Sequence, residues 1–389
     1  MLLLVLVCSW SALAETTAIL PFANVSKNPT LDWVGESIAE SLREAFASEG
    51  LLVAERDARV DAYKKLGVRD NGLIARATVL KIGETMDAEK VVFGRFELLQ
   101  APGAKPSVKI VARVADLAKT RQSAEFSELG ALDDLMTLQN HLAWQAWKFI
   151  VAGSAVAEEE FLRRRPAIRL DALENYVRGL MAANSDQKHR YFTQAARIDP
   201  KFSPPLFQLG KLQFEKEAYR VAADWLAKVT ESDAHHREAK FLLGLSHYYS
   251  LDFTGAETAF RIVARTVPVN EVLNNLGAAL LRQGQFDAAL EQFEKAREGD
   301  GADPDYHFNI GYAKWRRGDY EAAAERFRAV LERDSSDEDA TLLLGTCLKK
   351  MAPRVDGRTE GLERIKEEYE ESAYWQLKSM LEKTGGEKK

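Results

Sequence analysis

The chain has 389 residues, 46% of them hydrophobic and 29% charged, and its formal net charge at pH 7 is −6. These proportions are typical of a folded protein rather than a disordered one, and the length predicts two or more domains. Binding of nucleic acid depends on clustered lysine and arginine, so the negative net charge argues against a nucleic-acid partner.

Residues 1–14 form an apolar run that ends in Ala12-Leu13-Ala14. A short apolar run with this small-x-small ending is typical of a secretory signal peptide, and it predicts cleavage before Glu15 and a periplasmic protein. The run is too short to span a bilayer. A buried N-terminal strand is the alternative interpretation. No lysine or arginine precedes the run, so the sequence leaves open whether Met1 is the true start.

Residues 15–160 alternate between apolar runs, which predict strands, and stretches with apolar residues at helical spacing. The expected strands cover residues 17–22, 51–54, 91–99, 107–117 and 122–129. The expected helices cover residues 32–49, 58–66, 73–82 and 132–151. The last three strands are close enough in sequence to pair as an antiparallel meander. The pattern predicts an α/β domain with a mixed sheet and helices on at least one face.

Four short motifs of this region also resemble a known domain. They are residues 18–26 (AILPFANVS), 33–39 (WVGESIA), 53–56 (VAER) and 91–94 (VVFG). They are similar to the amino-terminal domain of the TolB family of periplasmic proteins and to related domains of CsgG-type secretion lipoproteins. The resemblance implies an α/β fold in the cell envelope. TolB proteins carry a β-propeller after this domain, and the present sequence continues differently, so their partners are not implied.

Residues 161–171 are expected to link this domain to the next part of the chain. Glu160 and Arg164 are four residues apart, as are Glu159 and Arg163, which supports the end of a helix that Pro166 then terminates. This spacing favours a helix exit over a basic docking site.

A helical repeat then begins, marked by one recurrent glycine. Gly210, Gly244, Gly277, Gly311 and Gly345 are separated by 34, 33, 34 and 34 residues. An alanine follows twelve residues after the first four of these glycines, and proline closes two of the units. The period and the small-residue positions resemble the tetratricopeptide repeat, a helix-turn-helix unit. The resemblance implies that residues 172–352 form an all-α solenoid of an abbreviated first unit and about five repeats.

Residues 353–389 are expected to form a capping helix and a disordered tail. The helix is predicted over residues 361–381 because apolar and aromatic side chains recur there, among them Leu362, Ile365, Tyr369, Tyr374 and Leu377. A solenoid exposes the apolar face of its last repeat unless another element covers it. Residues 384–389 are expected to be disordered.

No motif of the sequence predicts catalysis, a metal site or a cofactor. Residues 35–39 (GESIA) lack the second glycine of a nucleophile elbow. The side chains of His235 and His236 are adjacent in a loop and diverge, which favours a solvated turn over a metal site. His247 is expected in the core, and Cys347 is expected to be a buried, unreactive thiol.

A groove is the remaining candidate site. In proteins with these repeats the first helices line a concave face, and positions near the recurrent glycine point into it. The resemblance implies that the groove residues here are Phe207, Lys211, Phe241, Leu245, Tyr249, Asn274, Arg282, Phe308, Tyr312 and Arg316. Aromatic residues and arginine are enriched where interfaces concentrate binding energy. Some aromatics can belong to the core instead, and this alternative is open for Phe214, Tyr248 and Trp315.

The sequence therefore predicts a non-enzymatic, exported scaffold or adaptor of the cell envelope that binds a protein or peptide in its groove. Two alternatives stay open. One is a sensor of small ligands or glycans that uses the N-terminal domain, and the other is a structural assembly or secretion component that oligomerises through that domain. Contact with membrane proteins, the oligomeric state and the identity of the partner are also open, because many unrelated functions share this architecture.

Overall fold

A computed structural model provides the three-dimensional structure of the chain. The residues that it describes are 16–26, 28–69, 72–100, 103, 105–151, 156–165, 168–352, 359–371, 374, 375 and 378. The expected signal peptide at residues 1–14 and the expected tail at residues 384–389 lie outside these residues. The chain divides into two compact units, Met1–Pro205 with Trp375–Lys389 and Leu206–Tyr374. Each unit is described by itself.

The first unit contains a mixed six-stranded sheet. Its strands are β1 (Thr17–Ile19), β2 (Ala23–Asn24), β3 (Lys90–Leu99), β4 (Ser107–Asp116), β5 (Arg121–Gln122) and β6 (Phe126–Ala131). Strands β1 and β2 pair with β3 in parallel, whereas β4 pairs with β3, β5 and β6 in antiparallel fashion. The predicted meander is therefore present. The strand expected at residues 51–54 is reduced to a single bridge between Val53 and Thr17.

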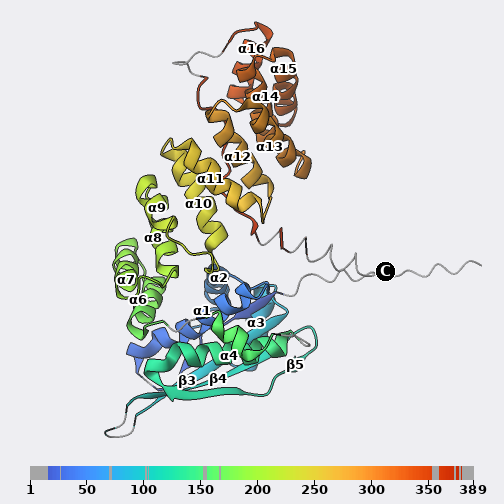
Figure 1. Cartoon of the computed structure of the whole chain (residues 1–389). Helices are drawn as coiled ribbons and strands as arrows, with labels where there is room; N and C mark the ends of the chain where they lie inside the picture. Colours follow the sequence, from blue (N-terminus) through green and yellow to red (C-terminus); the bar gives the residue numbers. More distant parts are fainter. Residues whose placement is uncertain are drawn as a thin grey trace, which may run out of the picture. The chain divides into compact units, whose positions relative to one another are not determined.

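Helices cover the sheet and complete the core of this unit. They are η1 (Pro29–Leu31), α1 (Asp32–Ser48), α2 (Arg56–Leu66), α3 (Arg76–Thr85), η2 (Leu132–Asp134), α4 (Leu135–Ile150) and α5 (Glu158–Arg163). Helix α4 lies across β4 and β6 and also contacts α1 (Figure 1). A fully buried apolar face forms along α1 because Val34, Ile38, Leu42 and Phe46 recur at the spacing of one helical turn.

Two further helices, α6 (Leu170–Met181) and α7 (Ser185–Ile198), also belong to the first unit. They correspond to the abbreviated repeat of the sequence. Helix α6 contacts both α7 and α1. The Tyr176 ring packs against Phe192 and Phe202, with ring centroids 5.9 and 5.1 Å away. The compact units therefore divide after Pro205, whereas the sequence pattern places the domain boundary at residues 161–171.

The second unit is a succession of antiparallel helix pairs that stack in chain order (Figure 1). Its helices are α8 (Pro204–Glu215), α9 (Tyr219–Leu226), α10 (His236–Tyr249), α11 (Phe253–Ala264), α12 (Asn270–Arg282), α13 (Phe286–Gly299), α14 (Pro304–Arg317), α15 (Tyr320–Arg333) and α16 (Glu338–Leu348). This confirms the predicted fold class, an α/β domain followed by an all-α repeat array. Among the described residues, no helix combines the length and the apolar character needed to cross a membrane.

The recurrent glycines mark the points where the two helices of each pair approach most closely. A Cβ atom at Gly244 would lie 2.6 Å from the Phe260 ring, and one at Gly277 would lie 2.7 Å from the Phe293 ring. At Gly345, by contrast, no described atom outside the neighbouring backbone of α16 lies within 4 Å of the Cβ position, and α16 is the last repeat helix among the described residues. The repeat period therefore records contacts between paired helices.

Replacing Gly277 by alanine is expected to lower the free energy of unfolding by about 1–2 kcal/mol. Overpacking against the buried Phe293 ring costs about 1–3 kcal/mol, and the higher helix propensity of alanine offsets up to about 1 kcal/mol. The control Gly345→Ala meets no neighbour and should be neutral or slightly stabilising. The difference in urea midpoint between the two variants checks this expectation, and equal midpoints would contradict it.

Residues 359–371, called the C-terminal segment here, do not form the predicted capping helix. Residues 362–370 have no helical structure, and helical conformation begins only at Glu371. Residues 362–370 run along α14, α12 and α10, and groove side chains pair with the backbone of Arg364 and Lys366. The last repeat helix correspondingly keeps exposed apolar side chains, including Leu348 at 63% exposure. The prediction of a helix over residues 361–381 is therefore wrong for the first half of that range.

Candidate peptide-binding groove

Three asparagines on the first helices of two successive pairs form the floor of the groove. Asn274 and Asn275 belong to α12 and Asn309 belongs to α14, and all three side chains are fully buried. Buried amide groups need hydrogen-bond partners, because leaving them unpaired costs free energy. Their partners are one another and backbone groups of the C-terminal segment.

The asparagines pair with both polar backbone groups of Arg364 and Lys366, two residues of the segment that are two positions apart. Asn309 accepts a bond from the N–H of Arg364 at 2.7 Å and donates to its carbonyl at 2.8 Å. Asn275 does the same for Lys366, accepting at 2.9 Å and donating at 2.7 Å. Asn274 donates a further bond of 2.8 Å to the Arg364 carbonyl. Residues i and i+2 of an extended chain face the same side, so this pairing selects an extended backbone.

The Glu363 side chain lies in a closed pocket of the groove. It is 1% exposed and forms an ion pair of 3.2 Å with Arg282 of α12. The Tyr248 hydroxyl of α10 donates a short hydrogen bond to the same carboxylate. Burial and the nearby Glu363 charge raise the pKa of Tyr248 far above its ordinary value, so the hydroxyl keeps its proton and remains a donor. The pocket is therefore complementary to an anion.

Carboxylates at the beginnings of α14 and α16 form the cation-binding part of the groove. Asp303 and Asp337 cap these helices by accepting bonds from backbone N–H groups, which explains why acidic residues stand there. Arg364 pairs with Asp305 at 2.9 Å and also with Asp337, and its guanidinium lies 3.9 Å from the centre of the Phe308 ring. This combination of ion pairs and ring contact suits arginine better than lysine.

Lys366 completes the cation-binding part. Its ammonium lies 2.7 Å from Asp303 and 2.6 Å from Asp305. Burial acts to raise the pKa of Asp305, but hydrogen bonds from Lys366 and Arg364 outweigh it and hold that pKa below its ordinary value. Asp305 is therefore ionised at neutral pH, which keeps this part of the groove negative.

Aromatic contacts hold the later residues of the segment against α10. The Tyr369 ring stacks on Phe241, with ring centroids 4.9 Å apart. The Tyr249 hydroxyl donates a 2.6 Å bond to Glu367, and Arg237 pairs with Glu371. The segment therefore runs from the last repeats toward the earlier ones, opposite to the order of the repeats in the chain.

The structure brings six of the ten sequence-predicted groove residues into direct contact with the segment. They are Phe241, Tyr249, Asn274, Arg282, Phe308 and Tyr312, of which Tyr312 donates to the Thr359 carbonyl at 2.8 Å. Arg316 is linked to the segment through Tyr312, because it donates a 3.3 Å hydrogen bond to the Tyr312 hydroxyl.

The other three predicted residues lie elsewhere in the second unit. Leu245 is fully buried. Phe207 stacks on the His235 ring at 4.5 Å, and Lys211 lies 3.5 Å from Glu238. Among the described residues, none of these three makes a hydrogen bond, ion pair or ring contact with the segment.

The aromatic residues near the groove differ in their place: some belong to the repeat core, and some belong to both the core and the groove. Phe241 packs on Phe260, and Phe308 packs on Phe327, so both rings belong to the repeat core as well as to the groove floor. Trp315 is 1% exposed and donates to the Met351 carbonyl, which places it in the core.

Sequence reasoning predicted Asn274 as a groove residue but missed Asn275, Asn309 and the aspartates, which make most of the polar contacts with the segment. Asn275 and Asn309 are 34 residues apart and each stands two residues before a repeat glycine. Amides that recur at an equivalent position on a helix surface are the signal that could have found them. The aspartates Asp303, Asp305 and Asp337 were hidden because acidic residues at helix N-termini are common as caps.

The remaining chemical candidates have ordinary roles. His235 pairs with Glu238 at 3.3 Å, and His247 lies 2.9 Å from Asp252. Cys347 is 3% exposed, and burial raises the pKa of its thiol to about 11. Such a thiol is a poor nucleophile at neutral pH.

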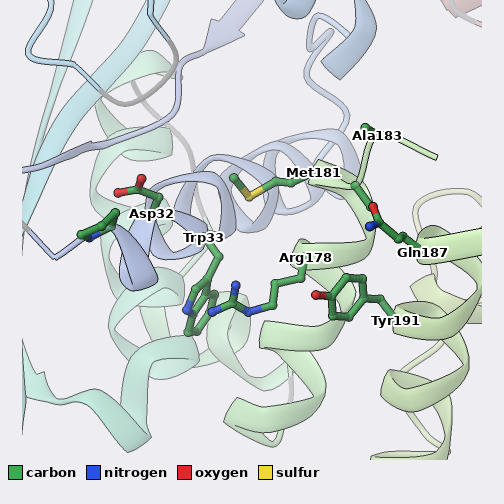
Figure 2. Close-up of a pocket in the computed structure, with 9 residues that line it drawn as sticks. Asp32, Trp33, Arg178, Met181, Ala183, Gln187 and Tyr191 are labelled. Atoms are coloured by element: carbon green, nitrogen blue, oxygen red, sulfur yellow. The ribbon is translucent and has the colours of Figure 1, made fainter.

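The first unit has a separate pocket of ≈ 360 Å³ between the beginning of α1 and the pair α6–α7. Figure 2 shows Trp33, Arg178 and Tyr191 among the side chains that line it. The Arg178 guanidinium is already paired, with Glu174 at 2.8 Å and with the Thr30 carbonyl at 3.0 Å. The pocket therefore offers no uncompensated charge from this arginine to a ligand.

One protein family matches part of the repeat array. The family described as "Tetratricopeptide repeat" matches residues 241–306 and 308–350. No curated protein matches this chain. Similar solved structures include YrrB, a TPR protein with an unusual peptide-binding site, at 18% identity and a TM-score of 0.42, covering 46% of this chain and 92% of YrrB. MamA from Desulfovibrio magneticus RS-1 has 24% identity and a TM-score of 0.40, covering 44% and 99%. The repeats within residues 241–350 are tetratricopeptide repeats.

Proposed function

We propose that this chain is a non-enzymatic scaffold of the cell envelope that binds an extended segment of a protein partner in its repeat groove. One observation supports the proposal above all others. The groove pairs with the N–H and the carbonyl of both Arg364 and Lys366, so it recognises an extended backbone. Every residue except proline offers these two groups, and a groove of this kind can therefore hold a segment of another protein.

The envelope location has separate support. The apolar run at residues 1–14, with its small-x-small ending, is typical of a secretory signal peptide. The motifs within residues 18–94 resemble the TolB amino-terminal domain, which belongs to periplasmic proteins. Export and envelope location rest on these two patterns of the sequence.

The test uses three full-length proteins, each crosslinked to its partners in envelope extract and then captured. The first is the unchanged chain, and the second carries Arg364→Glu, which places a carboxylate beside Asp305 and Asp337 and so loosens the C-terminal segment. The third adds Asn275→Ala and Asn309→Ala. Asparagine is the better choice than Phe308 or Tyr312, because truncating those buried rings would also destabilise the repeats.

The expected result is a defined partner that is enriched by the second protein and lost with the third. Equal capture by all three proteins would contradict a role for the groove and would place the binding surface elsewhere in the chain.

A further inference from the structure

We infer that the C-terminal segment is an intramolecular ligand that keeps the groove closed, and that the partner which replaces it is an extended peptide of the same chemistry. That chemistry is a carboxylate, an arginine directly after it, a second cation two residues later and an aromatic ring three residues after that. The inference rests on the proposed function and specifies its partner and its regulation.

The Glu363 pocket makes the first position selective. A buried carboxylate is tolerated only when cations or donors compensate it, and Arg282 and Tyr248 do so here. A neutral or basic side chain at this position would remove the ion pair of Arg282, whose side chain is only 21% exposed. Arg282 and Tyr248 both contact Oε1 of the carboxylate, whereas Oε2 has no hydrogen bond among the described residues.

The cluster of Asp303, Asp305 and Asp337 makes the second and fourth positions selective. Its three carboxylates pair with two cations of the segment, Arg364 and Lys366. Asp305 contacts both cations, Asp337 contacts Arg364, and Asp303 contacts Lys366. A peptide with acidic residues at these positions would place like charges together at distances where repulsion is strong. The groove therefore discriminates between an Arg-x-Lys order and an acidic sequence.

Tyr369 marks the end of the pattern. It stacks on Phe241, which itself packs on Phe260 of the repeat core and cannot withdraw without opening that core. From Glu363 to Tyr369 the contacts cross α14, α12 and α10, so the recognition pattern is seven residues long. Backbone pairing alone would accept most sequences, whereas these side-chain contacts accept few.

The covalent connection gives the segment an advantage over any free peptide. Residues 349–358 join it to α16, and a ligand on a connection of this length experiences an effective concentration of about 1 mM or more. A partner in solution competes against that concentration. Its apparent dissociation constant is its intrinsic dissociation constant divided by the fraction of chains whose groove is open. Opening the groove is therefore a step that controls partner binding.

The experiment uses a fluorescent synthetic peptide with the sequence of residues 359–371 and full-length proteins. Anisotropy titrations compare the unchanged chain, Arg364→Glu, and Arg364→Glu with Asn275→Ala and Asn309→Ala. A control peptide exchanges the residues at positions 363 and 364, which keeps its composition. Hydrogen exchange of residues 360–370 in the unchanged chain is measured with and without excess unlabelled peptide.

We expect Arg364→Glu to bind the peptide at least about tenfold more tightly than the unchanged chain, because its own segment no longer competes. The protein with both asparagines replaced and the control peptide should each bind at least about tenfold more weakly. Excess peptide should increase exchange of residues 360–370 in the unchanged chain, a readout that does not depend on any substitution.

Three results would overturn the inference. Equal peptide affinity of the unchanged chain and Arg364→Glu would show that the segment does not compete. Equal binding of the control peptide would show that the groove does not read this chemistry. A dimer that dissociates on Arg364→Glu would show that the segment binds a second copy.

The inference and the proposed function fail in different ways. If no protein binds the peptide, but a partner is still captured from envelope extract in a manner that requires Asn275 and Asn309, the inference is wrong and the proposed function stands. If the peptide binds as expected and capture is independent of both asparagines, the proposed function is wrong.

Discussion

Replacing Arg59 by methionine is expected to lower the free energy of unfolding of the first unit by about 3 kcal/mol. Arg59 is 4% exposed, contacts Glu36, lies 3.7 Å from Glu40 and donates to the Ile19 carbonyl of β1 at 3.3 Å. Removing one partner of a buried ion pair costs about 3–5 kcal/mol, because the remaining charge stays buried. We expect the lower end of this range, because in the variant Glu36 still pairs with Arg56 and Glu40 still pairs with Arg43.

The electrostatics of Glu40 support this expectation. Burial acts to raise the pKa of Glu40, but the charges of Arg43 and Arg59 outweigh it and hold that pKa below its ordinary value. The carboxylate is therefore charged in the folded protein and depends on both arginines.

A matched control lies on the same helix. Lys64 of α2 pairs with Asp61 at 3.3 Å, but its side chain is 72% exposed. Exposed ion pairs contribute about 0–1 kcal/mol, so Lys64→Met should change stability little. Hydrogen exchange of strand β3 over a urea series, read by mass spectrometry, follows the first unit alone. Equal shifts for Arg59→Met and Lys64→Met would contradict the expectation.

Replacing Asn275 and Asn309 together by alanine is expected to release the C-terminal segment. The two amides make four hydrogen bonds to the backbone of Arg364 and Lys366. At about 0.5–1.5 kcal/mol each, their loss weakens closure by about 2–6 kcal/mol. Exchange of residues 360–370 should therefore become about 30-fold faster or more, which mass spectrometry measures.

Gln283→Ala is the control for this second prediction. Gln283 directly follows α12, the first helix of its repeat. Its side chain donates to the Phe253 carbonyl at 3.1 Å and to Glu257 at 2.9 Å, and among the described residues it makes no hydrogen bond to the segment. Its replacement removes hydrogen bonds of similar number from the same region of the array. If it accelerates exchange of the segment as much as the asparagine changes do, the asparagines do not hold the segment in place.

The repeat array could be predicted from the sequence because its contacts recur locally. Gly277 and Phe293 lie in neighbouring helices sixteen residues apart, and the same contact returns between Gly244 and Phe260. Each helix pair closes within its own repeat, so spacing along the chain reports spacing in the structure. The assignment of Phe241, Phe308 and Tyr312 to the groove came instead from the resemblance to the tetratricopeptide repeat.

The conformation of the C-terminal segment could not be predicted in this way. Its local pattern favours a helix, but Arg364 pairs with a residue 55 positions away and Lys366 with one 91 positions away. A helix would satisfy the same backbone groups internally, so the two conformations compete on side-chain contacts alone. Those contacts, with Arg282, Asp305 and Asp337, come from three different helices.

By itself, the sequence determined the α/β domain and the repeat array, because these follow from periodicities within one element or one repeat. Only the tertiary structure decided that residues 362–370 are not helical, that Asn275 and Asn309 pair with the backbone of Arg364 and Lys366, and that α6 and α7 belong to the first compact unit. The physical reason is the same in each case. Hydrogen bonds and ion pairs between distant residues leave no periodic trace in the chain, and their geometry exists only after the elements have packed.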